Sequence, residues 1–298
     1  MSVDASLPDP GPPPRQVPTP VQISLLFGGL LNLFGWLFLL VGLVFVSIFA
    51  VQADGWSLWL AGAETDLVDG TVTAANGTGW REGGKGKRAV PVKRFAFEFA
   101  DSTGTRRSGI SFAARLDVRP GQPVKVEVPR ERPERACIAG MRRAVLPSAA
   151  LLVLLAPLVA AGLTLAGLRG GRRACRLLAF GHATTCVLVE KAPTRSRINN
   201  RPVLRLIFEF DARDGRRRRV AALTHRPELL ESEGRGLVFY DPWAADNAVV
   251  LQGLPGHPQW AADRSFRLGS PAHPWQVAIL PVLNLLGYGT LALYLKLA

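Results

Sequence analysis

Charged side chains are absent from three long stretches of this sequence: from Gln16 to Ala53, and over residues 144–168 and 277–295. A helix needs about 20 apolar residues to cross the hydrocarbon core of a bilayer, so each stretch is long enough to span. The composition agrees, with 48% hydrophobic and only 20% charged residues. These values exclude a purely soluble enzyme. The two polar segments that remain have roughly 100 residues each, which is too few for a large catalytic domain.

The sequence is also poor in groups that carry chemistry. Its cysteines are Cys137, Cys175 and Cys186, which form no C-x-x-C pair and are odd in number, so neither a disulfide framework nor a zinc site is expected. The four histidines are scattered, and no G-x-S-x-G elbow is present. No ionisable residue interrupts the apolar stretches, which argues against a transporter. We therefore expect no enzyme activity, no metal and no cofactor.

The N-terminus predicts an anchored chain with a flexible leader. Residues 1–20 are rich in proline, which is incompatible with a helix and predicts a disordered tail. The apolar stretch after this leader is about twice as long as the core of a cleavable signal peptide. It is therefore interpreted as a signal anchor. The predicted transmembrane helices cover residues 21–52, 144–168 and 276–296.

The first polar segment, residues 64–141, has the pattern of a small β module. After an acidic stretch, Thr71–Thr73 is a short strand candidate, and the glycine-rich residues 76–87 predict a flexible loop. Apolar and polar residues then alternate over 90–99, as expected of a half-buried strand. A turn at 101–105 and a strand over 106–112 complete a hairpin, and a further strand is expected over 124–128.

The second polar segment, residues 179–254, repeats this order. Phe208-Glu209-Phe210 parallels Phe97-Glu98-Phe99, and the polar stretch 191–200 takes the place of the first loop. Residues 255–275 are expected to be a linker. The predicted fold class is an α+β membrane protein with three transmembrane helices interleaved with two small all-β modules, each barrel-like or sandwich-like.

One spacing resembles a phosphate-binding loop but fails its other requirements. Residues 79–85 have the G-x-x-x-x-G-K spacing, yet the next residue is Gly86 where Ser or Thr would hold magnesium, and a strand comes next where a helix is needed. A hairpin loop is the favoured interpretation.

The alternating strands resemble a family known as domain of unknown function 3592. The matching residues are Gly70-Thr71-Val72-Thr73, Phe95 to Phe99 and Gly121 to Pro129, and in the second copy Phe208 to Phe210 and Gly236 to Pro242. The second copy departs from the pattern at Gly181 to Thr184. The resemblance covers about half the chain and implies a bacterial membrane-associated β module flanked by transmembrane helices, with no established reaction. It carries over no catalytic residue.

Positive charge suggests the partner. The chain has a net charge of +13, and both polar segments are basic. Anionic lipid headgroups are the expected partner beside a bilayer, possible contacts to other membrane proteins are left open, and nucleic acid is not expected. The candidate headgroup or partner contacts are Arg142, Arg143, Arg169, Arg172, Arg173, Arg216, Arg217, Arg218 and Arg219. In a strand, however, the four arginines at 216–219 alternate between two faces, so at least one pair is expected to be merely solvated.

Topology has two alternatives. Three spans place the modules on opposite sides of the membrane, with a slight preference for a cytoplasmic N-terminus. A re-entrant second stretch bent at Pro157 would instead put both on one side, although it is too short for two full crossings. The sequence thus predicts a multi-pass protein of the bacterial inner membrane with a non-enzymatic binding or scaffold role. The alternative is an accessory subunit of a transport or envelope-maintenance complex.

Overall fold

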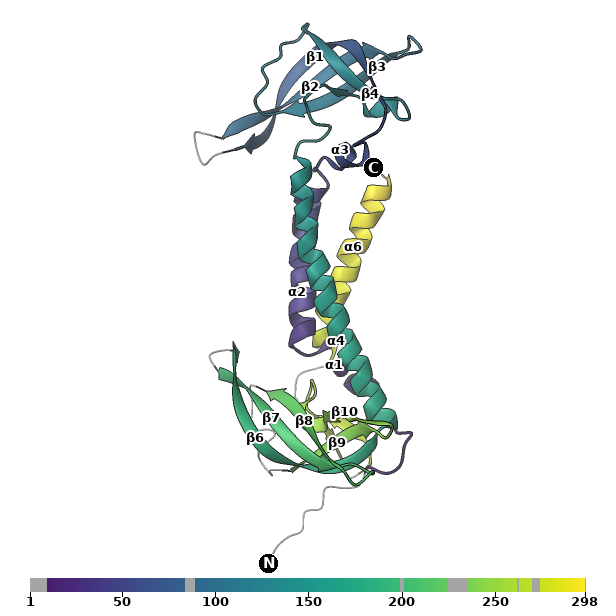
Figure 1. Cartoon of the computed structure of the whole chain (residues 1–298), viewed down its shortest axis with the longest axis vertical. Coiled ribbons are helices and arrows are strands. Elements are labelled where there is room, and N and C mark those ends of the chain that lie inside the picture. Colours follow the sequence, from purple (N-terminus) through teal and green to yellow (C-terminus); the bar gives the residue numbers. More distant parts are fainter. Residues whose placement is uncertain are drawn as a thin grey trace, which may run out of the picture. The chain divides into compact units, whose positions relative to one another are not determined.

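A computed structural model describes residues 10–83, 89–198, 201–224, 235–261, 263–269 and 274–297. The chain divides into two compact units. Unit 1 contains residues 1–40 and 158–298, and unit 2 contains residues 41–157. Each unit holds one five-stranded sheet. The predicted mixture of long apolar helices with two β sheets is confirmed at this level (Figure 1).

The sheet of unit 2 is antiparallel and has the order β3-β2-β1-β4-β5. Its strands are β1 (Thr65–Glu82), β2 (Val90–Ala100), β3 (Arg106–Ala113), β4 (Pro123–Pro129) and β5 (Cys137–Ile138). Its core lies on one face, where Phe95, Phe97 and Phe99 are at most 4% exposed and pack with Val72 and Val126. The alternation along β2 therefore identified the buried face correctly.

The loop predicted at residues 76–87 is wrong for its first half. Strand β1 continues to Glu82, which pairs with Val90, so the acidic stretch and the glycine-rich stretch both belong to one strand. The glycines fit because the register shifts between Gly77 and Arg81, and Gly79 has a φ of +81°. Residues 84–88 of the predicted loop, and with them part of the phosphate-loop spacing, lie outside the described residues.

The sheet of unit 1 has the order β8-β7-β6-β9-β10. Its strands are β6 (His182–Ile198), β7 (Arg201–Asp211), β8 (Arg217–Thr224), β9 (Arg235–Asp241) and β10 (Ala244–Val250). The edge strands β8 and β10 lie against each other, which makes the sheet nearly a closed barrel around Leu206, Phe208 and Val238. The loop predicted at 191–200 is again mostly strand, because β6 stays paired with β7 as far as Ile198.

The two sheets share more than their strand order. In β1 the register against β2 shifts between Val72 and Ala74 and again between Gly77 and Arg81. In β6 the register against β7 shifts between Leu188 and Glu190 and again between Pro193 and Arg197. Both strands thus carry irregularities at the same spacing. A bulge bends its strand and increases the local twist, so the two long hairpins curl in the same way.

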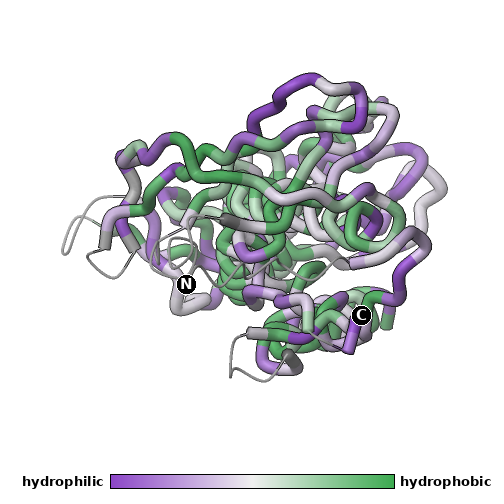
Figure 2. The backbone as a smooth tube through the Cα atoms, turned by 90° about the horizontal axis from the view of Figure 1, so that it is seen from below, coloured by the Kyte–Doolittle hydropathy of each residue, from purple (hydrophilic) through white to green (hydrophobic). Residues whose placement is uncertain are grey.

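Three helical segments are long and apolar enough to cross a membrane: Leu30–Ala50, Ser148–Phe180 and Trp275–Leu297. The first consists of α2 (Leu30–Phe45) and a π-helical turn (Val46–Ala50). Helix α1 (Thr19–Phe27) comes before α2 and is separated from it by a break at Gly28. The second consists of a 3-10 segment (Ser148–Leu154) and α4 (Leu155–Phe180), and the third of a 3-10 turn (Pro274–Ala278) and α6 (Ile279–Leu297). Figure 2 shows the long hydrophobic (green) stretches of chain and the hydrophilic (purple) residues at many of the turns.

The helix that contains most of the second predicted span continues twelve residues past Leu168, to Phe180. With about 1.5 Å per α-helical residue and 2.0 Å per 3-10 residue, Ser148–Phe180 is roughly 50 Å long, well above the ~30 Å of a hydrocarbon core. The extra turns are folded into unit 1: Ala174, Leu177 and Leu178 are buried against β9 and α1. A packed face therefore maintains the helix where hydropathy alone would end it.

Within unit 1 the apolar helices contact one another through small and polar residues. A side chain at Gly35 of α2 would collide with Thr164 of α4, and one at Gly167 would collide with Asn32. Asn284 of α6 donates to the carbonyl oxygen of Trp36 at 2.9 Å. Small residues of this kind allow helices to approach closely in a lipid environment.

The proline-rich leader is ordered from Pro10 onward, which departs from the predicted disorder. The backbone N–H of Arg15 donates to the carbonyl oxygen of Ala179 at 2.8 Å, and its guanidinium donates to that of Gly181 at 2.8 Å. The same guanidinium lies 5.3 Å from the ring centroid of Phe239. These contacts fasten the leader to the C-terminal end of α4, where unpaired carbonyl groups attract a cation.

The segment predicted as a linker also contains regular structure. Strands β11 (Pro258–Trp260) and β12 (Phe266–Leu268) form a small antiparallel hairpin. Phe266 is 2% exposed and packs on Phe239, with ring centroids 5.8 Å apart. The hairpin thus closes the core shared by α1, α4 and β9.

Candidate functional site

Four exposed arginines follow the apolar part of α4 directly. Arg169, Arg172, Arg173 and Arg176 are spaced three and four residues apart, so they share one side of the helix, and Phe180 continues it at 61% exposure. We call these four arginines the α4 arginine face. The sequence singled out three of them, and the structure adds Arg176 and Phe180.

The turn between β9 and β10 lies beside this face. Arg176 and Leu177 line a cavity of about 410 Å³ together with Asp241 and Trp243, and a second cavity of about 240 Å³ lies between Arg172 and Asn247. Trp243 is 95% exposed. Arg173 is tied to the turn, because its guanidinium donates to the Asn247 side chain and to the carbonyl oxygen of Ala248.

In the part of the chain that the structure describes, the charge of the α4 arginine face is not balanced by carboxylates. Within the described ranges, Arg169, Arg172, Arg173 and Arg176 have no carboxylate within salt-bridge distance, although Asp241 lines both cavities. An arginine offers bidentate donors that match phosphate and carboxylate groups. The arrangement is therefore chemically suited to anions, with exposed aromatic rings at its end.

The second arginine cluster, Arg216 to Arg219, differs from the first because most of its side chains approach carboxylates. Arg217 and Arg219 lie on one face of β8 and approach the Glu209 carboxylate at 3.5 and 3.2 Å. Arg218 points to the other side and approaches Asp214 and Asp246 at 3.3 and 3.0 Å. These carboxylates raise the pKa of the Arg218 guanidinium, with the Asp214 hydrogen bond as the largest cause. The alternation predicted for this run is present, and most of its charge is already balanced.

Arg142 and Arg143 lie where the segment before β1 meets the segment after β5, as in the bridge between Ala53 and Leu146. We call this part of unit 2 the neck. The backbone N–H of Arg143 donates to the buried Asp54 carboxylate at 2.9 Å, and its guanidinium donates to the carbonyl oxygen of Arg135 at 2.8 Å. Arg142 approaches Glu82 at 2.9 Å. Both arginines therefore have structural contacts within the unit.

Two tryptophans, Trp56 and Trp59, lie at the same neck. Their rings meet edge to face, with the centroids of Trp56 and Trp59 5.5 Å apart. The guanidinium of Arg135 lies 4.1 Å from the Trp56 centroid, and that of Arg132 lies 4.6 Å from the Trp59 centroid. Cation–π contacts of this kind hold both arginines beside the rings while Trp59 stays 59% exposed.

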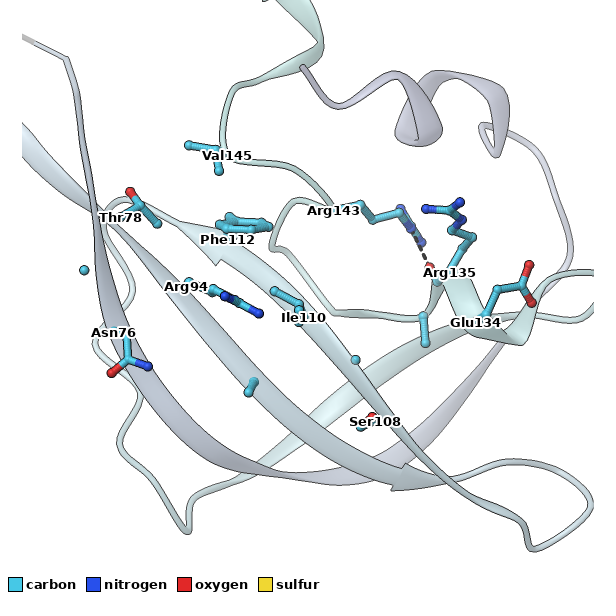
Figure 3. Close-up of a pocket in the computed structure, with 14 residues that line it drawn as sticks. Asn76, Thr78, Arg94, Ser108, Ile110, Phe112, Glu134, Arg135, Arg143 and Val145 are labelled. Carbon is cyan, nitrogen blue, oxygen red and sulfur yellow. Dashed lines mark hydrogen bonds between the residues drawn. The ribbon is translucent and has the colours of Figure 1, made fainter. Parts of the chain in front are cut away.

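A large hollow lies between the sheet of unit 2 and this neck. Its volume is about 850 Å³. Figure 3 shows Arg94, Ile110 and Phe112 on the strands, with Arg135, Arg143 and Val145 on the segments across from them. We call this the neck hollow. The remaining lining residues are Asn76, Gly77, Thr78, Ala96, Ser108, Gly109, Glu134 and Ala136.

The sequence did not identify the neck hollow, although one signal was visible. Arg94 and Ala96 alternate with the core phenylalanines, which puts them on the opposite face of β2. The cover of that face could not be inferred, because Arg135 and Arg143 come from a segment far along the chain. Trp243 was missed for a similar reason, since nothing in a turn sequence shows that it lies beside a helix 70 residues earlier.

Metal and thiol chemistry find no support in the described part of the chain. No group of three or more His, Cys, Asp or Glu side chains is arranged to hold a metal ion there. Burial raises the pKa of Cys186 to about 12, and burial also raises that of Cys137, so neither thiol is activated.

No family model, curated protein or solved structure matches this chain. The resemblance to domain of unknown function 3592 therefore stays a prediction, and the functional argument rests on the geometry above.

Proposed function

We propose that the protein crosses the bacterial inner membrane three times and binds anionic lipid headgroups through the α4 arginine face, in a binding or scaffold role without catalysis. The two sheets are then two copies of one β module. Their common strand order and their equally spaced register shifts support the duplication. The bacterial location rests on the family resemblance alone.

One observation carries the lipid proposal: an apolar helix continues without a break into four exposed arginines that have no salt bridge in the described ranges. From Ser148 to Leu168 the helical segment is roughly 35 Å long, enough for a hydrocarbon core. Arg169, Arg172 and Arg173 then follow within about 6 Å along the axis, which is the depth of a headgroup layer. Each arginine near such a surface contributes about 1 kcal/mol of attraction.

The exposed aromatic rings also support a headgroup location for the α4 arginine face. Phe180 and Trp243 end the arginine face at 61% and 95% exposure. Tryptophan and tyrosine side chains are enriched where a protein meets the membrane–water interface, which fits Trp243. Trp59 and Leu58 give unit 2 an exposed apolar surface of the same kind, five to ten residues after the first span.

The test uses the full chain reconstituted in lipid nanodiscs of phosphatidylcholine with a minor fraction of phosphatidylglycerol. Native mass spectrometry of the released protein would count the lipids that stay bound. We expect enrichment of phosphatidylglycerol for the wild type and a large loss for Arg169→Ser, Arg172→Ser and Arg176→Ser combined. The matched control is Arg216→Ser, Arg217→Ser and Arg219→Ser, which removes the same charge from the arginine run at the start of β8.

Equal enrichment in both triple variants and the wild type would contradict the proposal, and so would an equal loss in both variants.

The alternative role, an accessory subunit of a transport or envelope-maintenance complex, is favoured by the uncovered apolar surface of the helices, where Leu158 and Leu285 are 65% and 70% exposed. It predicts a stoichiometric membrane partner after mild detergent extraction.

A further inference from the structure

The neck hollow has a mixed lining. Among its described lining residues, three arginines, Arg94, Arg135 and Arg143, occur with one acidic residue, Glu134. The side chains of Ile110, Phe112 and Val145 supply an apolar part. Small-molecule sites typically have volumes of about 300–1,000 Å³ and combine apolar walls with a few convergent polar groups. At about 850 Å³ the hollow is within this range.

Of the three arginines that line the neck hollow, Arg94 has the fewest side-chain contacts within the protein. It is exposed on β2, and its side chain has no salt bridge or hydrogen bond among the described contacts. Arg143 uses two of its donors on Arg135 and Ser57, and Arg135 stacks on Trp56. These contacts fix the positions of two guanidinium groups beside the hollow. A positioned cation loses less conformational entropy on binding than a free one.

The hollow also lies next to the ends of two candidate spans. The ring of Trp80, on the long hairpin of β1 and β2, lies 6.1 Å from that of Phe49 in the last turn of the first span. On the other side, the backbone of Leu146 pairs with that of Gln52 at 3.0 Å, two residues before the second span begins. Both the sheet and the neck therefore reach the residues that leave the apolar helices.

We propose that the neck hollow binds one anionic amphiphile, with its carboxylate or phosphate at Arg94, Arg135 and Arg143 and the first part of its acyl chain against Ile110, Phe112 and Val145. The approach from the bilayer rests on the membrane insertion proposed above, whereas recognition of the amphiphile does not. The two sources of this chemistry are a free fatty acid and an anionic phospholipid.

The experiment measures binding of a fluorescent long-chain carboxylic acid to the full chain in a neutral detergent. Arg94→Ser removes one charge-assisted contact and is expected to weaken binding by about tenfold or more. Asn76→Phe places a ring on the face of the sheet that carries its pairing partner Arg94 and is expected to block the hollow. Glu134→Gln removes the one carboxylate and is expected to tighten binding.

Matched controls separate the hollow from general surface effects. Arg106→Ser removes an exposed charge at the start of β3, and Ser102→Phe adds an exposed ring in the neighbouring turn. Both are expected to bind the probe as the wild type does. The triple variant of the α4 arginine face should also bind normally, so failure of the headgroup proposal would leave this result unchanged.

Competition identifies the source. Displacement of the probe by unlabelled fatty acid, by short-chain phosphatidylglycerol or by both supports the proposal and names the ligand class. Displacement by a long-chain alcohol as effectively as by the acid would overturn it, because charge would then not be recognised. Wild-type affinity in Arg94→Ser and Asn76→Phe proteins that melt normally would overturn it as well.

Discussion

Single residues in this protein connect parts of the chain that are distant in sequence. Arg15 is the clearest case, because its guanidinium donates to carbonyl oxygens of both the leader and the end of α4. The helix ends just before Gly181, where any Cβ would lie 2.5 Å from the Leu177 carbonyl oxygen. The last carbonyl groups of α4 thus obtain partners from a residue more than 160 positions earlier.

Replacing Arg15 by alanine is expected to destabilise unit 1 by about 1–2 kcal/mol, since charge-assisted hydrogen bonds at a helix C-terminus are lost. Thermal unfolding in detergent would measure the change. Arg15→Lys should lose less because it keeps the charge, and Gln16→Ala, at an exposed position, should lose nothing. A wild-type melting temperature for Arg15→Ala would show that the leader contributes no stability.

The buried cysteines give a second prediction at this scale. Because burial raises the pKa of Cys186 to about 12, its thiol stays protonated at pH 8 and is a poor nucleophile. Cys137 is similarly buried, at 1% exposure. In a Cys175→Ser protein we therefore expect no maleimide labelling in the native state and labelling of both remaining thiols after denaturation. Native labelling of Cys186 would show that the second sheet opens.

Low pH should destabilise the hairpin of β2 and β3 through protonation of Asp101, which lies in its turn. Hydrogen bonds from Thr103 and Arg107 hold the pKa of this carboxyl well below its usual range. Its stabilising effect is therefore complete above the unfolded pKa of 3.8 and is lost as the pH falls toward the lower folded value. Asp101→Asn should lower the melting temperature at pH 7 and make it less sensitive to acid. Parallel melting curves of variant and wild type against pH would contradict this.

At the scale of elements, the sequence predicted strands where apolar and polar residues alternate and failed where the strand chemistry is atypical. Phe95, Phe97 and Phe99 mark the buried face of β2 because nothing interrupts their period of two. Gly77, Gly79 and Pro193 are typical of loops, yet they lie in β1 and β6 near register shifts that tolerate them. A prediction from composition alone therefore makes long hairpins with irregular pairing too short.

Helix α4 illustrates the complementary failure. Hydropathy locates its apolar part but ends the helix at Arg169, because a run of arginines is unfavourable inside a bilayer. The helix continues because its opposite side buries Leu177 and Leu178 against residues of β9 and α1, which only the folded chain brings together. For the candidate site, the sequence thus supplied the arginines but neither their shared face nor the turn beside them.

Packing between the apolar helices predicts an asymmetric response to alanine. At Gly35 an added Cβ would lie 2.4 Å from Thr164 Oγ1 and 2.9 Å from its backbone nitrogen, so α2 and α4 must separate. We expect a loss of about 1–3 kcal/mol. At Gly162 an added Cβ meets nothing within 4 Å, and alanine should be neutral or slightly stabilising. Melting of both variants in the same detergent checks this, and equal effects would contradict the helix contact.

At the scale of the whole molecule, the central prediction concerns topology. The segment Ser148–Phe180 lies between the two sheets in the chain, and a segment that crosses a membrane once leaves its two flanking sheets on opposite sides. Reporter fusions at Gly83 and in the turn at Gly215 should therefore report different compartments. The same compartment for both would favour the re-entrant arrangement bent at Pro157 and remove the basis for three crossings.

The continuity of α4 has one more consequence, which concerns angular phase. One unbroken helix presents Thr164 toward α2 and, further along, its arginines toward the turn at Trp243. Each residue advances the azimuth by about 100°, so a single residue inserted after Leu168 would rotate one contact surface away from the other. Seven inserted residues would nearly restore the alignment. The number of residues between Thr164 and Arg172 is thus constrained by rotation around the helix axis, independently of the amino acids that fill those positions.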